Sequence, residues 1–139
     1  MKSMPIVLIL AASIALAGCS SDTKPALTDD QLAHEYVSKV YGKQLEDAAA
    51  GPTVASAAAL DSANSNCTIM REGQKDGLLS TKTGDPANAT WIHDIEIRSA
   101  SSASWTARQT LDALEISAKY KCPEFTPMLQ DFDAVHGTN

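Results

Sequence analysis

Histidine and carboxylate side chains come together at His93, Asp94 and Glu96, the nearest approach to a catalytic cluster in this 139-residue chain. An imidazole beside carboxylates can move protons or bind a metal ion. Zinc needs three or four converging ligands, and the other two histidines, His34 and His136, are isolated in the sequence. We therefore expect a solvated polar face here, with no catalytic residue, no metal site and no cofactor. An enzyme that uses His93, Asp94 and Glu96 is the unfavoured alternative.

The first 18 residues have the organisation of a secretory signal. Lys2 supplies one positive charge, an apolar run follows from Met4 to Ala17, and the chain turns polar directly after Cys19. The apolar run of about 14 residues is shorter than the roughly 20 that a membrane-spanning helix needs. We therefore expect residues 1–18 to be removed on export, with cleavage before Cys19.

The four residues at this cut, Leu16-Ala17-Gly18-Cys19, resemble the lipobox of bacterial lipoproteins. The resemblance implies that the Cys19 thiol carries a diacylglycerol and that Cys19 becomes the first residue of the mature protein. Two or three acyl chains hold a protein firmly at a bilayer, where a single chain is marginal. Residues 19–27 then form a lipidated cysteine and a polar tether. An ordinary signal peptide with a coincidental cysteine is the alternative.

The composition of the mature part limits what it can bind and how it can fold. Without Lys2, ten basic residues remain against 17 acidic ones, and this balance argues against nucleic acid as a partner. Leu, Ile, Val and Phe make up only 20 of its 121 residues, while alanine is abundant. Alanine favours helices but buries little apolar area. The domain is therefore expected to need a covalent cross-link.

Two cysteines remain once Cys19 is lipidated, and they are Cys67 and Cys122. Export places them in an oxidising compartment, where an even pair is typical of a disulfide. The two cysteines are 55 residues apart. Closing a loop of that length stabilises a fold by about 4 kcal/mol in the loop-entropy estimate. Two free buried thiols or a metal-binding pair are the alternatives.

Capping residues and apolar periodicity predict the first two helices. Thr28 and Gln31 match a capping box, and the apolar stripe that follows continues to Leu45 at helical spacing. Pro52 can occupy the first position of a second helix, and its periodic pattern stops at Gly73.

Two further helices are expected near the C-terminus. Ser101, Ser102 and Ser104 are candidate N-caps for a helix that ends at Pro123 and carries Cys122 on its buried face. A last short helix begins at Thr126. Both cysteines of the expected disulfide therefore lie on apolar helix faces.

The stretch between Thr90 and Ser99 is compatible with two structures. Apolar and polar residues alternate in it, as in a strand, yet Pro86 is a good helix start and a helical stripe is also present. A lone strand would be unstable, so we favour a helix. The expected fold is an all-α bundle of about four to five helices over residues 28–136 with one disulfide. A mainly α fold with a short strand near 90–98 is the alternative.

The positions of several residues are similar to a short helical domain of unknown function found in mycobacterial and mycobacteriophage secreted proteins and lipoproteins. The resemblance covers roughly residues 28–125. It rests on a cysteine after an alanine-rich helix, a following glycine, the opening of a late helix and its Cys-Pro ending, here Cys67, Gly73, Trp105-Thr106-Ala107-Arg108-Gln109 and Tyr120-Lys121-Cys122-Pro123. It implies a disulfide-linked helical fold and no particular activity.

The sequence thus predicts a non-enzymatic lipoprotein of the cell envelope, anchored to the membrane by lipid and facing the extracytoplasmic side. Phosphate-binding loops, HExxH, Gly-x-Ser-x-Gly and Cys-x-x-Cys motifs do not occur in it. Its expected partners are the membrane, through the lipid, and an envelope protein. A phage-encoded lipoprotein that acts in superinfection exclusion or envelope modification is the alternative.

Overall fold

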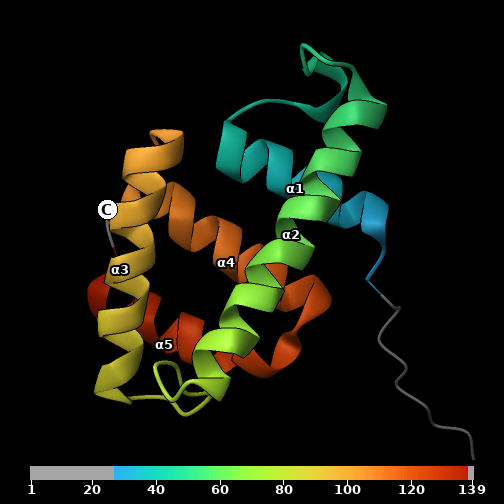
Figure 1. Ribbon diagram of the computed structural model, residues 1–139. Coiled ribbons are helices and arrows are strands. Elements are labelled where there is room, and N and C mark those ends of the chain that lie inside the picture. Colours follow the sequence, from blue (N-terminus) through green and yellow to red (C-terminus); the bar gives the residue numbers. More distant parts are fainter. Residues whose placement is uncertain (1–26, 138–139) are drawn as a thin grey trace, which may run out of the picture.

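A computed structural model describes residues 27–137, so Cys19, the signal segment 1–18 and all but the end of the tether lie outside the described residues. The described part contains five α-helices and two short 3-10 helices, and no strand (Figure 1). Their order is α1 (Asp29–Tyr41), η1 (Leu45–Asp47), α2 (Pro52–Lys75), α3 (Pro86–Ala103), α4 (Ala107–Lys121), η2 (Pro123–Phe125) and α5 (Thr126–His136). The expected all-α bundle with one disulfide is confirmed, and residues 90–98 are helical.

Side-chain caps fix the start of α1 and of α4. The Thr28 hydroxyl accepts from the Gln31 N–H, and the Gln31 side chain accepts from the Thr28 N–H, which confirms the predicted capping box. Thr106 and Gln109 form the same reciprocal pair at the start of α4. The N-cap of α4 is therefore Thr106, and the expectation of a serine cap was wrong. Ser104 instead ends α3 in a left-handed conformation, with φ of 56°.

The second helix runs further than its apolar pattern predicts. Gly73 does not end α2, because it lies inside the helix and is buried. The turn is made at Gly77, whose φ of 72° is the left-handed conformation that glycine tolerates best. The N–H groups of Leu78 and Leu79 then donate to the Gly73 carbonyl. At the other end of α2, Val54 is 57% exposed.

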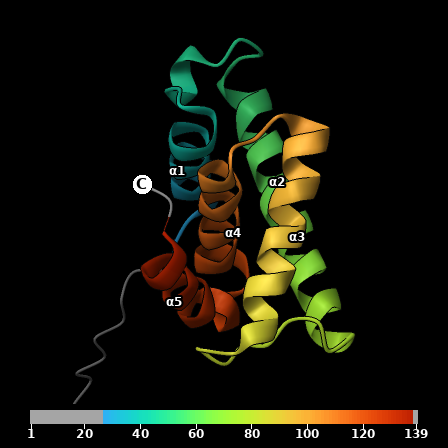
Figure 2. The same ribbon diagram turned by 90° about the vertical axis from the view of Figure 1, so that its left-hand side faces the viewer.

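Helix α4 runs through the middle of the bundle and packs against all four other helices (Figures 1 and 2). One core cluster joins α1, the first half of α2 and α4, with Tyr36 and Ile116 among its members. A second cluster joins the end of α2 with α3, α4 and α5, around Ile92, Leu111 and Phe125. The two clusters lie along α4, which contributes to both.

The disulfide between Cys67 and Cys122 lies in the second cluster and connects α2 to the end of α4. Both cysteines are buried, and their Cα atoms are 5.9 Å apart, within the usual range for a bridge. The predicted pairing is thus confirmed. None of the helices between residues 27 and 137 is both long and apolar enough to cross a bilayer.

Removing the disulfide should destabilise the fold strongly. We expect Cys67→Ser/Cys122→Ser to lower the free energy of unfolding by about 4 kcal/mol, because the bridge restricts a long loop of the unfolded chain. Urea unfolding followed by helical circular dichroism measures the difference. Cys67→Ser alone should cost nearly as much as the double variant, and an unchanged midpoint in either would contradict the expectation.

Candidate functional site

The structure brings together only two of the three residues in the sequence-predicted polar cluster. His93 Nδ1 lies 2.8 Å from Glu96 Oε2, one turn along α3. Asp94 instead accepts a hydrogen bond of 2.6 Å from Arg98. The His93 ring is edge-on to Phe132 and near His136 of α5. Across residues 27–137, no three His, Cys, Asp or Glu side chains converge in a way that would hold a metal ion.

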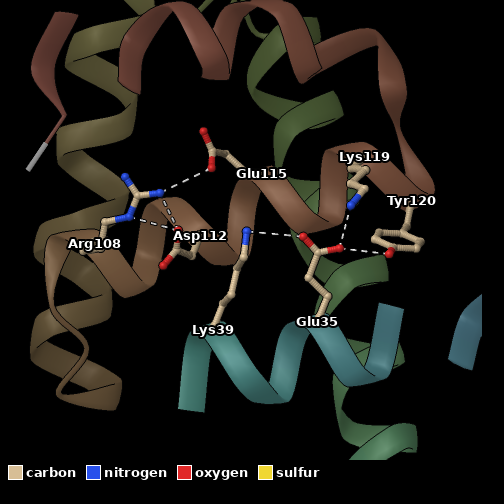
Figure 3. A network of polar contacts seen from close by, with 7 residues as sticks. All are labelled: Glu35, Lys39, Arg108, Asp112, Glu115, Lys119 and Tyr120. Atoms are coloured by element: carbon tan, nitrogen blue, oxygen red, sulfur yellow. Dashed lines mark hydrogen bonds and ion pairs between the residues drawn. The ribbon is translucent and has the colours of Figure 1, made fainter. Parts of the chain in front are cut away.

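A larger group of charged residues joins α1 to α4 (Figure 3). The Glu35 carboxylate accepts a hydrogen bond of 2.6 Å from Lys119 Nζ and one of 2.9 Å from the Tyr120 hydroxyl. Lys39 Nζ approaches its other oxygen at 3.4 Å. Burial alone would raise the pKa of Glu35, but these donors and charges outweigh burial and hold its pKa below the usual 4.5. Glu35 is therefore a charged contact between the two helices.

The same face of α4 carries a second set of charges around Arg108. Its guanidinium donates to Asp112 and to Asp133 of α5, the latter at 2.6 Å, and lies 3.6 Å from Glu115. Burial and the neighbouring Asp133 raise the pKa of Glu115, and Arg108 offsets part of that rise. Because each of these side chains contacts an opposite charge, the arrangement connects α4 to α5. The cavity between the two sets is small, about 190 Å³.

A groove of about 480 Å³ lies between α2 and α3. Helices α2 and α3 both pack against α4 and are joined at one end by the loop 76–85 (Figure 1). The apolar lining of the groove comes from three segments: Ile69 of α2, Leu78 of the loop, and Trp91 and Ile95 of α3. Ile69 and Leu78 are 39% and 58% exposed, so apolar surface remains open to water.

Trp91 of α3 and Gly73 of α2 lie in direct contact in this groove. A Cβ atom added to Gly73 would lie 2.7 Å from Trp91 Nε1, a distance at which atoms clash. Gly73 thus lets the indole lie directly against α2. Only 8% of Trp91 is exposed, so the domain itself covers most of the indole. The remaining surface of the ring lines the groove.

The side chain of Asn88 holds the loop that closes one end of the groove. Its carbonyl oxygen accepts from the Ser80 N–H at 2.8 Å, and its amide donates to the Lys82 carbonyl at 2.9 Å. Asn88 is 4% exposed and so is itself part of the interior. These two hydrogen bonds hold residues 80–82 of the loop against α3.

The charged rim of the groove differs between its two sides. On α3, Asp94 and Arg98 neutralise each other. On the α2 side, Glu72 and Asp76 are exposed and form no ion pair with any described residue. The groove thus joins an open apolar surface to an unpaired acidic edge, whereas the charges in Figure 3 satisfy one another. We take the groove as the candidate binding site.

Sequence reasoning did not find this groove. The sequence indicates Gly73 only as a helix end, and nothing in it says that Gly73 meets Trp91. A glycine inside an otherwise continuous helical pattern is a signal of close packing. No protein-family model, curated protein or solved structure matches this chain. What the chain does must therefore be inferred from its own residues.

The charged contact at Glu35 should appear in the pH dependence of stability. A folded-state pKa below the unfolded value of 4.5 means that ionised Glu35 stabilises the fold above that pH, and that this contribution disappears as the pH falls below it. We expect Glu35→Gln to lower the free energy of unfolding by about 1 kcal/mol at about pH 7, since Glu35 is partly solvated.

Urea unfolding of the variant and the unaltered protein should give curves whose separation narrows as the pH drops below 4.5. Glu72→Gln is the matched control, because Glu72 is exposed and has no ion pair among the described residues. A separation that stays constant through that range would show that the charge of Glu35 is not what stabilises the contact.

Proposed function

We propose that this chain is a lipoprotein of the bacterial cell envelope, held by lipid on Cys19 at the extracytoplasmic side of a membrane, and that its helical domain binds a partner rather than catalysing a reaction. The observation that carries the binding role is the groove between α2 and α3. It combines exposed Ile69 and Leu78 with a nearly buried indole and unpaired carboxylates. Contiguous exposed apolar surface beside convergent polar groups is typical of interaction sites.

The proposed anchor is supported by the sequence at the N-terminus. Leu16-Ala17-Gly18-Cys19 follows an apolar run too short to span a bilayer and precedes a polar segment. The described domain begins at the cap residue Thr28. A tether of about nine residues, which reaches roughly 30 Å when extended, would let the domain stand off the membrane surface. The resemblance to the mycobacterial domain family belongs to this proposal and assigns no activity.

The arrangement of charges favours binding over catalysis. A general acid or base works best when its pKa lies near the working pH and when it faces a cavity that receives substrate. Arg108 and Glu35 instead form multiple ion pairs that join helices. His93 and Glu96 pair with each other on an exposed surface of α3. The groove offers recognition surface without a similar acid–base pair pointing into it.

Lipid attachment can be tested at one atom. We expect labelled palmitate to be incorporated into the protein expressed in a bacterial host, and Cys19→Ala to abolish the label, because only a thiol supplies the nucleophile for the thioether. Val54→Ser keeps Cys19 and the disulfide and is the matched control, which should label normally. Label retained in Cys19→Ala would refute the anchor.

The binding role can be tested with a photo-crosslinking phenylalanine derivative placed at Leu78 in cells. We expect one discrete adduct from this position and none from Val54, which is similarly exposed but lies outside the groove. The adduct is identified by mass spectrometry, and the purified partner is then titrated calorimetrically. Binding should weaken in Ile69→Ser and not in Val54→Ser. Equal adducts from both positions, or equal affinities, would argue against a role for the groove.

A further inference from the structure

We infer that the groove between α2 and α3 takes a basic amphipathic helix from a partner protein, an inference that rests on the proposed binding function and names the class of partner. The apolar side chains of the bound helix would enter between Ile69, Leu78 and Ile95. The Lys or Arg side chains of the same helix would reach Glu72 and Asp76. Each part of this assignment follows from a different property of the groove.

Two exposed apolar side chains, those of Ile69 and Leu78, lie together in this groove. Leu78 is more than half exposed, although it follows the helix end directly and its neighbour Leu79 is buried. Ile69 of α2 lies nine residues before Leu78 in the sequence, and Ile95 of α3 lines the same groove. Covering such side chains gains about 25 cal/mol for each Å² removed from water. The other exposed aliphatic residues, including Val54 and Ile97, lie outside the groove.

The walls of the groove favour a helix over an extended peptide. Residues 69–75 and 87–98 are helical, so most of their backbone N–H and C=O groups are already paired within α2 and α3. An extended peptide would bury backbone groups without partners, whereas a helix satisfies its own. From Ala87 to Arg98 the α3 wall is about 16 Å long, which equals three turns of a bound helix.

The charge of the rim selects a basic partner. Glu72 and Asp76 are exposed, one turn apart, and lack ion-pair partners among the described residues. Across the groove the only cation of the lining, Arg98, is already neutralised by Asp94 at 2.6 Å. The chain as a whole has a formal charge of −6, which also attracts a basic segment over longer distances.

The indole of Trp91 adds an orienting contact. The ring lies against Gly73 of α2 and lines the groove. A polar side chain of the bound helix, such as glutamine or serine, can accept a hydrogen bond from the indole N–H, which would fix the register of that helix.

The test uses the full-length lipoprotein in detergent and three fluorescein-labelled peptides of about 14 residues, or roughly 21 Å of helix. The first has leucine and lysine at helical spacing, the second has glutamate in place of lysine, and the third has serine in place of leucine. We expect fluorescence anisotropy to show saturable binding of the first peptide, about tenfold or more weaker binding of the other two, and loss of affinity with added salt.

Charge reversal at the rim, Glu72→Lys/Asp76→Lys, should weaken binding of the first peptide about tenfold. The matched control, Asp47→Lys/Asp61→Lys, changes the net charge equally at exposed positions outside the groove and should leave affinity unchanged. Leu78→Ser should also weaken binding, and Val54→Ser should not. Equal loss in both charge variants would reduce the effect to net charge and overturn the assigned site.

Two other results would overturn the assignment of the partner. If the first peptide does not bind while the adduct at Leu78 persists in cells, the groove binds something other than a basic helix, and the proposed function stands. If light scattering shows a dimer that Leu78→Ser dissociates and Val54→Ser does not, a second copy of this chain is the occupant. An absent adduct together with absent peptide binding removes both the inference and the function it rests on.

Discussion

The disulfide between Cys67 and Cys122 is the constraint on which the arrangement of the domain depends. It joins the second half of α2 to the end of α4 within the second core cluster. Leucine, isoleucine, valine and phenylalanine are scarce in this chain, and alanine supplies much of the helix surface. Small side chains let helices approach closely but stabilise them little. With α2 fixed to α4 covalently, α3 and α5 have a rigid surface on which to pack.

Ion pairs join α4 to α1 and α5, two helices that the disulfide does not connect to it. Glu35 connects α1 to the outer face of α4, and Arg108 connects that face to Asp133 of α5. Such contacts are individually weak when partly solvated. They specify which faces meet, because wrong pairings would place like charges together. The interior of α4 thus supplies apolar packing on one side, and its polar side directs two neighbouring helices.

Local signals in the sequence predicted the helices well, and long-range contacts account for what they missed. The Thr28 cap, the place of Cys67 in α2 and the place of Cys122 at the end of α4 depend on residues a few positions apart. The sequence pattern therefore predicts them. The strand alternative for 90–98 fails because Trp91 and Ile92 pack in a cluster with α2, α4 and α5, and residues 27–137 contain no strand with which this stretch could pair. Gly73, by contrast, is explained by Trp91, which is 18 residues away and meets it only in the folded chain. A cap at Thr106 competed with three serines nearby, and sequence alone did not rank them.

The groove also results from the scarcity of large apolar side chains in this chain. Both α2 and α3 pack on α4, and Trp91 of α3 lies directly against α2 because residue 73 has no side chain. Filling the remaining space would need further large apolar residues at the end of α2, where Glu72 and the cap residue Asp76 stand instead. The loop that carries Leu78 is nevertheless fixed by Asn88, through hydrogen bonds to Ser80 and Lys82. An apolar side chain held in one exposed position loses little conformational entropy when a partner covers it, so the domain is preorganised for binding at this face.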